Sequence, residues 1–150
     1  MFINKQKHVL FINVGNLLES IMKLKDTALF RQAALVGGDW IEVDSSNAIT
    51  VDNPATGETI GLVPNLGVEE TRKAIAAAEV AQKEWATRTA KERSNILRCW
   101  FDLMMENQDD LGAILTAEQG KPLPEAKGEI TYGASFIEWF SEEARRIYGD

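Results

Sequence analysis

A glycine followed by a lysine, Gly120-Lys121, is the first feature of this sequence that could do chemistry, because such a pair can cradle a phosphate. A P-loop also needs a glycine five positions before its Gly-Lys pair, a Ser or Thr after it, and a strand that leads in. Leu115 and Pro122 occupy those two positions, and the preceding residues have a helical pattern. We therefore predict that Gly120 ends a helix and that Lys121 lies near the free carbonyl groups of that end.

The single cysteine, Cys99, is the second candidate for chemistry. A thiol becomes a good nucleophile when a neighbouring base or cation favours the thiolate. The only histidine is His8, close to the N-terminus, whereas Cys99 stands between Arg98 and Trp100 in a predicted helix. We expect a half-buried packing cysteine. A lone cysteine also excludes an intramolecular disulfide and is typical of a reducing compartment, so we expect a cytoplasmic protein.

Two pairs of adjacent carboxylates, Asp109-Asp110 and Glu142-Glu143, could suggest acid-base chemistry or a metal site. Adjacent side chains on a helix point about 100° apart, and no His or Cys joins either pair at a metal-ligand spacing. We interpret both pairs as solvated helix surface. The dinucleotide fingerprint G-x-G-x-x-G is also absent. The residues therefore predict no catalytic, cofactor-binding or metal-binding side chain in this chain.

The composition is that of an ordinary globular protein. The 150 residues fit one domain, with 45% hydrophobic and 26% charged residues. The formal net charge is -7 and the basic residues are scattered, which argues against nucleic acid as a partner. No apolar run reaches the length of about 18 residues that a membrane span needs, so we expect no membrane partner.

Two β-hairpins are predicted in the first half of the chain. The stretch ALVGGDWIEV places Gly37-Gly38-Asp39 between two apolar β-forming segments. A second pair of strands flanks Asn53-Pro54-Ala55-Thr56-Gly57, where proline presets one turn dihedral and Gly57 can adopt the left-handed conformation that closes the loop.

After Gly67 the apolar period changes to about 3.6 residues, and four helices are predicted. The second begins with the capping-box residues Thr89 and Glu92, and a break is expected near Asn107. The fourth follows Pro124 and is expected to end at Gly149. The fold class is thus α+β, with N-terminal β-hairpins followed by about four helices.

Three of these helices have an apolar face that we expect to be packed. The face of the first is mostly alanine, and that of the second is the strongest apolar stripe in the chain. The predicted faces are Ile75, Ala78, Ala81 and Trp85; Ile96, Leu97, Trp100, Phe101, Met104 and Met105; and Ala126, Ile130, Gly133, Ile137, Phe140, Ala144 and Ile147.

Residues 1–21 differ from the rest of the chain. They combine two lysines and a histidine with a short apolar run that Asn13 interrupts, and no small-x-small cleavage site follows, so a signal peptide is a poor interpretation. Met22 begins a stretch that resembles a natural start. We expect residues 1–21 to be a non-native or disordered leader and residues 22–150 to be the folded part.

Three stretches resemble the N-terminal part of the aldehyde dehydrogenase superfamily. They are NPATGETIGLVPNLGVEETRKAI, TAKERSNILRCWFDLMMENQDDLGAILTAEQGKPLPEAKGEI and FIEWFSEEARRIYGD. The last two most resemble succinate-semialdehyde dehydrogenases, with glutarate-semialdehyde dehydrogenases next. The resemblance covers about residues 22–150, and it implies an incomplete aldehyde dehydrogenase domain, a fragment of the α/β fold on the side of the cofactor domain.

The resemblance implies an NAD- or NADP-dependent oxidation of a semialdehyde to the dicarboxylate. In that chemistry a cysteine thiolate attacks the aldehyde, a hydride passes to the nicotinamide, and a glutamate activates the water that hydrolyses the thioester. It implies that these residues and the cofactor-contacting segments lie beyond Asp150, and Cys99 does not match the catalytic motif. No family site residue carries over, and we expect no cofactor to bind this chain alone.

Two function classes remain open. The chain is the N-terminal part of a semialdehyde dehydrogenase, inactive by itself, or it is a non-catalytic module that acts by protein association. The resemblance implies that the complete enzyme is a homo-oligomer and that part of the apolar helix surface is buried against segments this chain lacks. We therefore expect exposed apolar faces, and a fragment that self-associates or forms a loosely packed globule. The nucleotide sequence downstream of Asp150 would discriminate the two classes, because an in-frame or frameshifted continuation favours the first.

Overall fold

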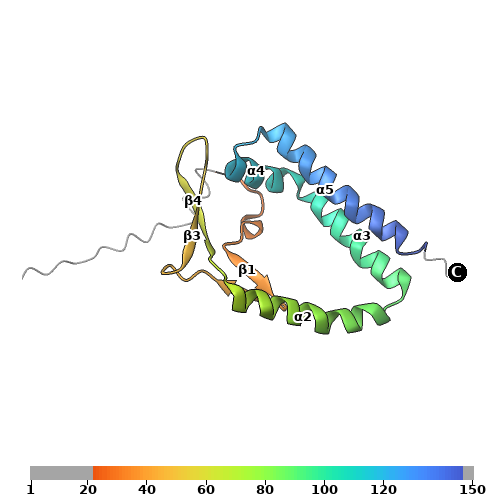
Figure 1. The fold of residues 1–150 in the computed structure, drawn as a ribbon. Helices are drawn as coiled ribbons and strands as arrows, with labels where there is room; N and C mark the ends of the chain where they lie inside the picture. The colour runs from red at the N-terminus through yellow and green to blue at the C-terminus, as the bar shows by residue number, and fades with distance from the viewer. Residues whose placement is uncertain (1–21, 147–150) are drawn as a thin grey trace, which may run out of the picture.

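The computed structural model describes residues 22–146, in which small β-hairpins precede four helices (Figure 1). The predicted α+β order is confirmed. The elements are the 3₁₀ helix η1 (Thr27–Leu29), the strands β1 (Ala33–Val36), β2 (Asp39–Glu42), β3 (Ala48–Asp52) and β4 (Thr59–Pro64), and the helices α2 (Val68–Thr87), α3 (Ala90–Glu106), α4 (Gln108–Gln119) and α5 (Leu123–Glu143). The expected leader, His8, Ile147 and Gly149 lie outside the described residues.

Both predicted hairpins are present, and their glycines have the dihedral angles that the turns need. β1 pairs antiparallel with β2 through Gly37 and Gly38, whose φ values are 64° and 94°. Positive φ at both central residues matches the twist of the flanking strands. β3 pairs with β4 with a register shift between Val51 and Asp52, and Gly57 closes the intervening loop with φ of 72°.

The helix ends follow local sequence signals. The hydroxyl of Thr89 accepts a hydrogen bond from the backbone N–H of Glu92. The carboxylate of Glu92 in turn accepts a hydrogen bond from the backbone N–H of Thr89, as the capping box predicts. Gly120 ends α4 in the left-handed conformation with φ of 71°. α5 contains the proline expected in its first turn but ends at Glu143, earlier than predicted. The backbone N–H groups of Arg145 and Arg146 then bond three residues back, to Glu142 and Glu143, which tightens the chain into a turn.

Packing is concentrated in two regions. A small core of Met22, Ile60 and Ala117 joins the N-terminal segment and β4 to α4, with Leu24, Phe30, Val51 and Ile114 around it. The second region is the contact of α5 with both α3 and α4 (Figure 1). Small residues let the helices approach here: a Cβ on Gly112 would lie 2.8 Å from Cγ of Lys127.

The predicted face of α2 is exposed, and the prediction that it packs within this chain is wrong, whereas the predicted face of α3 is half-buried in part, at Leu97, Phe101, Met104 and Met105. Helix α2 has no buried residue, and the side chain of Ile75 is 64% exposed. On α3, Trp100 is 55% and Ile96 is 42% exposed. The reason is the arrangement of the elements: α2 leaves the hairpins, contacts β1, and meets α3 only at an angle (Figure 1). Among the described helices, none combines the length and apolar character needed to cross a membrane.

Candidate functional site at the start of helix α4

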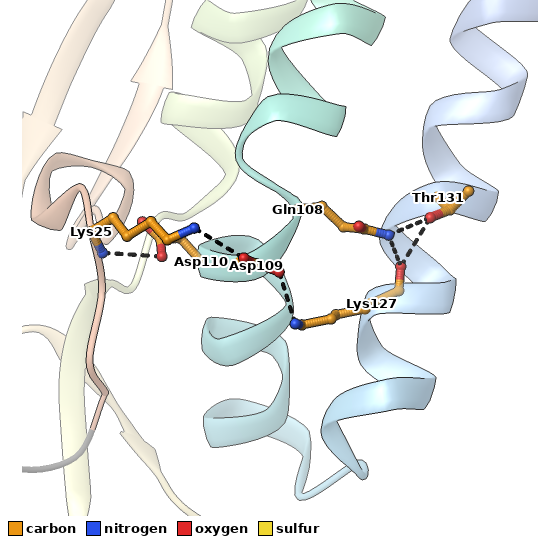
Figure 2. Close-up of polar contacts among 6 residues, drawn as sticks. All are labelled: Lys25, Gln108, Asp109, Asp110, Lys127 and Thr131. Atoms are coloured by element: carbon orange, nitrogen blue, oxygen red, sulfur yellow. Dashed lines mark hydrogen bonds and ion pairs between the residues drawn. The ribbon is translucent and has the colours of Figure 1, made fainter.

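A group of polar and charged side chains with several contacts to other elements lies at the start of α4. Asn107 ends α3 and immediately precedes α4, so the chain turns within one residue and the first turn of α4 faces both the N-terminal segment and α5. Gln108, Asp109 and Asp110 occupy that turn, and Figure 2 shows them between Lys25 on one side and Lys127 and Thr131 on the other.

Asp110 is buried, with 4% of its surface exposed, and the prediction of a solvated side chain is wrong. Its two carboxylate oxygens accept the backbone N–H groups of Lys25 at 3.1 Å and Asp26 at 2.8 Å. Such charge-assisted bonds compensate for the desolvation of a carboxylate. Asp110 therefore fastens the N-terminal segment to α4.

Asp109 points toward two lysines from different parts of the chain. Its carboxylate lies 2.7 Å from Nζ of Lys127 on α5 and 3.0 Å from Nζ of Lys25. The hydrogen bond with Lys127, and then the one with Lys25, lower the pKa of Asp109 to about 2. The hydrogen bond with Asp109 also raises the pKa of Lys25. Neutral pH thus leaves Asp109 as a carboxylate, unable to act as a general acid.

Gln108 adds a third connection, to α5. Its Nε2 donates to the carbonyl of Lys127 at 3.0 Å and to the hydroxyl of Thr131 (Figure 2). All three polar residues of this turn therefore contact other elements. No group of three or more metal-ligating side chains occurs within residues 22–146. We interpret the group as a structural joint between the N-terminal segment, α4 and α5.

The Gly120-Lys121 corner confirms one sequence prediction and corrects another. Gly120 caps α4, and its N–H donates to the carbonyl of Thr116 at 2.8 Å, so the corner has the geometry of a helix end. Lys121 was predicted near free carbonyl groups. Its Nζ instead forms an ion pair with Glu129, because the chain reverses at Pro122 and brings α5 beside it.

Cys99 is exposed, not half-buried as expected. It lies in the middle of α3, and the sequence offers no histidine between residues 22 and 146 to act as its base. Among the described residues, therefore, no histidine can serve as the base that activates this thiol for nucleophilic catalysis.

The described helix starts do not fit the phosphates of a dinucleotide. A helix N-terminus attracts anions through its free N–H groups. Each of the four described helices already has acidic residues in its first turn: Glu69 and Glu70 in α2, Glu92 in α3, Asp109 and Asp110 in α4, and Glu125 in α5. These carboxylates would repel a phosphate.

Comparison with known proteins assigns the chain to a protein family. Residues 40–150 match the aldehyde dehydrogenase family, and the chain belongs to that family. It is 64% identical over 129 residues to a glutarate-semialdehyde dehydrogenase of Pseudomonas aeruginosa, and 60% identical over 129 residues to an NADP⁺-dependent succinate-semialdehyde dehydrogenase of Escherichia coli. Each match covers 86% of this chain and 27% of the relative.

Solved structures give the same assignment. A crystal structure described as an E. coli NADP-dependent enzyme matches with a TM-score of 0.82 at 60% identity, covering 85% of this chain and 27% of that chain. A succinate-semialdehyde dehydrogenase from Burkholderia pseudomallei matches with a TM-score of 0.81 at 56% identity, with the same coverage. The hairpins and four helices thus correspond to the N-terminal part of the aldehyde dehydrogenase fold, and the chain spans about a quarter of the length of these relatives.

Proposed function

We propose that this chain is the N-terminal part of an NAD- or NADP-dependent semialdehyde dehydrogenase. The observation that carries the proposal is the 64% and 60% identity to dehydrogenases of glutarate and succinate semialdehyde. The similar levels of identity support the substrate class, a semialdehyde with a distal carboxylate, rather than one chain length. In this proposal residues 22–150 contribute framework, and the segments that complete the fold contribute nucleophile, base and cofactor site.

We propose further that the 150-residue chain alone oxidises no aldehyde and binds no nicotinamide cofactor. Cys99 lacks a base, the aspartates at the start of α4 are engaged in structural contacts, and every described helix start is acidic. Loss of a nucleophile alone removes many orders of magnitude from the rate of such catalysis. The purified chain with succinic or glutaric semialdehyde and NAD or NADP should give no absorbance of reduced nicotinamide above the blank. Protein-dependent reduction that disappears in Cys99→Ser would overturn this statement.

A fusion protein tests the positive part of the proposal. The whole chain is joined to the segment of the E. coli succinate-semialdehyde dehydrogenase that follows the matched part. At 60% identity the grafted part should support the fold, and the fusion should reduce NADP with succinic semialdehyde. The E. coli enzyme is the positive control. A folded fusion with no activity on either semialdehyde would contradict the proposed function.

A non-catalytic module that acts by protein association is the second candidate. The observation in its favour is the large exposed apolar surface, including Trp139 at 58% and Phe140 at 59% exposure. The fusion discriminates the two candidates, because a module that has lost its catalytic role has no requirement to complete an active dehydrogenase.

A further inference from the structure

The strand β4 has the composition of a segment that pairs readily with another chain. Its sequence, TIGLVP, contains no charged side chain and is rich in aliphatic residues. Uncharged apolar strands are the segments that associate through their edges when those edges are exposed. Within residues 22–146, β4 pairs only with β3, and the two strands form a separate two-stranded sheet. The outer edge of β4 is therefore a place where strand addition has to be prevented.

The backbone of Leu62 identifies this outer edge. In an antiparallel pair, successive residues direct their N–H groups alternately toward the partner strand and away from it. The N–H of Leu62 donates to Oε1 of Gln32 at 2.7 Å, so it points away from β3. Pro64 lies two residues further along the same edge and has no N–H. Neither position offers a free backbone donor to an incoming strand.

The N-terminal segment, residues 22–32, covers this edge of β4. A Cβ built on Gly61 would lie 3.0 Å from both Oε1 of Gln32 and Cζ of Phe30, so these two side chains lie directly on the backbone of β4. Ile60 is buried in the cluster that contains Met22, and Phe30 packs against the same cluster. The segment thus closes the edge with one hydrogen bond and with apolar contact.

The N-terminal segment is held at two places. Asp110 accepts the backbone N–H groups of Lys25 and Asp26, and Gln32 is bonded to β4. Between these points the segment forms a single turn of 3₁₀ helix and no strand. The amide oxygen of Gln32 accepts a hydrogen bond as the carbonyl of a neighbouring strand would. Because it belongs to a side chain, it satisfies the donor without presenting a new strand edge.

We propose that the N-terminal segment protects the outer edge of β4 from pairing with β4 of a second copy of this chain. The partner follows from the edge itself, because two identical uncharged edges can pair antiparallel about a two-fold axis. Gln32 is the central residue of the protection, since it occupies the N–H of Leu62, and Phe30 assists by covering Gly61. This inference does not depend on the proposed function.

Substitutions of Gln32 in the full 150-residue chain test the proposal. Gln32→Met keeps the length of the side chain and removes the acceptor, whereas Gln32→Glu keeps an acceptor and is the matched control. Hydrogen exchange of the Leu62 amide should be about tenfold faster in Gln32→Met. The infrared signal of intermolecular β-sheet should also increase, and Gln32→Glu should match the original chain in both measurements. A Leu62 amide that is unprotected in the original chain would overturn the proposal, as would faster exchange without intermolecular sheet.

A second variant displaces the same side chains and leaves Gln32 in place. The methyl group of Gly61→Ala would collide with Gln32 and Phe30, so this variant should also accelerate exchange at Leu62 and increase intermolecular sheet. Gly128→Ala, whose Cβ meets nothing within 4 Å, should do neither. Loss of the helical far-UV signal in both Gln32→Met and Gly61→Ala would show that the segment is needed for folding itself, and the proposal would be wrong.

Photocrosslinking identifies the strand that pairs. Photo-leucine is incorporated in place of leucine in Gln32→Met, and isotopically heavy and light chains are mixed so that products between copies can be recognised by mass spectrometry. The expected product joins Leu62 of one copy to β4 of another. Products between copies that involve only the helices would assign the association to apolar helix surface and would overturn the pairing of β4.

Discussion

Gly120 and Pro54 are in contact, although they belong to different motifs far apart in the sequence. A Cβ built on Gly120 would lie 2.9 Å from Cγ of Pro54, closer than real Cβ contacts. Pro54 is in the loop between β3 and β4, and Gly120 ends α4 with φ of 71°. The two stretches that most clearly resemble aldehyde dehydrogenases, NPATGE and EQGKPLPEAKGE, therefore meet in space, and glycine is required there for both its dihedral angle and its size.

We predict that Gly120→Ala lowers the free energy of unfolding by about 1–3 kcal/mol, because alanine is strained at this φ and its methyl group collides with Pro54. Gly128→Ala is the matched control, since a Cβ at Gly128 in α5 meets nothing within 4 Å. Alanine in the helix interior should raise stability by about 0.5–1 kcal/mol. Urea unfolding of the fusion protein described above, followed by far-UV circular dichroism, measures both. Equal effects of the two substitutions would show that the contact with Pro54 and the positive φ are unimportant.

We predict that Asp110→Asn destabilises the chain by about 1–3 kcal/mol, because the amide keeps one acceptor oxygen but turns an N–H₂ group toward a backbone donor. The segment around Lys25 and Asp26 should open first, and hydrogen exchange of these two amides should accelerate. Asp102→Asn is the control, as Asp102 forms an exposed ion pair with Arg98 at 3.2 Å and should cost less than about 1 kcal/mol. Unchanged exchange at Lys25 and Asp26 would contradict the anchoring role of Asp110.

These sites also show which features the sequence could predict. Gly37, Gly38, Gly57, Thr89 and Gly120 each act on a turn or helix end within a few residues, so composition and spacing sufficed to place them. Asp110 bonds to backbone groups 84 and 85 positions earlier, and nothing in its neighbourhood signals that partner.

The extent to which the apolar faces of α2 and α3 are buried could not be predicted from the sequence, for another reason. Amphipathic periodicity shows that a face needs cover but does not show which segment provides it. In residues 22–146 the α2 face has little cover and the α3 face is covered only in part, and this is consistent with a chain that spans 27% of its relatives. The absence of a recognisable catalytic group was inferred from residue types alone and stays a prediction until activity is measured.

The lowered pKa of Asp109 predicts how the stability of the folded chain changes with pH. The pKa is lowered from 3.8 to about 2, so the ionised form of Asp109 is more stable, relative to its protonated form, in the folded chain than in the unfolded chain. Its stabilising contribution is present above the ordinary value and is lost as the pH falls through the folded value of about 2. The difference in unfolding midpoint between the original chain and Asp109→Asn should be constant near neutral pH and shrink in strong acid.

Lys127 and Lys25 should lower the pKa of Asp109 by different amounts. Lys127→Met should raise the pKa of Asp109 more than Lys25→Met, because the hydrogen bond with Lys127 is the larger cause. Titration of the Asp109 carboxyl carbon by NMR in each variant measures the effect. A larger rise in Lys25→Met would show that the contact with the N-terminal segment dominates.

We predict that Lys121 stabilises the corner through Glu129 and has no role in phosphate binding. Lys121→Met should cost at most about 1 kcal/mol, as a partly exposed ion pair usually does. Glu129→Gln should cost a similar amount, and the double substitution should cost no more than either alone, which a double-mutant cycle measures. Phosphate should not change the melting temperature of the original chain. A phosphate-dependent increase that Lys121→Met abolishes would restore the phosphate-loop interpretation.

The last prediction concerns the isolated chain in solution. The six large side chains of the α3 stripe, residues 96 to 105, would each contribute about 1.5–3 kcal/mol if fully buried. With Trp100 at 55% and Ile96 at 42% exposure, much of this contribution is missing, and Tyr132 and Trp139 on α5 add further apolar surface. Two separate two-stranded sheets also leave unpaired strand edges. We therefore expect the chain to self-associate or to form a loosely packed globule while its far-UV spectrum stays helical.

Three measurements test this expectation together. Light scattering should show species larger than a monomer, an apolar dye should bind, and the near-UV circular dichroism of the four tryptophans should be weak. Trp139→Glu should reduce both scattering and dye binding, because it places a charge among the exposed aromatic side chains of α5, whereas Trp139→Phe should not. A sharp monomer peak with cooperative unfolding and no dye binding would instead show that residues 22–150 complete their own core. That outcome would favour the independent, non-catalytic module over the dehydrogenase part, because a closed core has no need of the segments that follow it in the relatives.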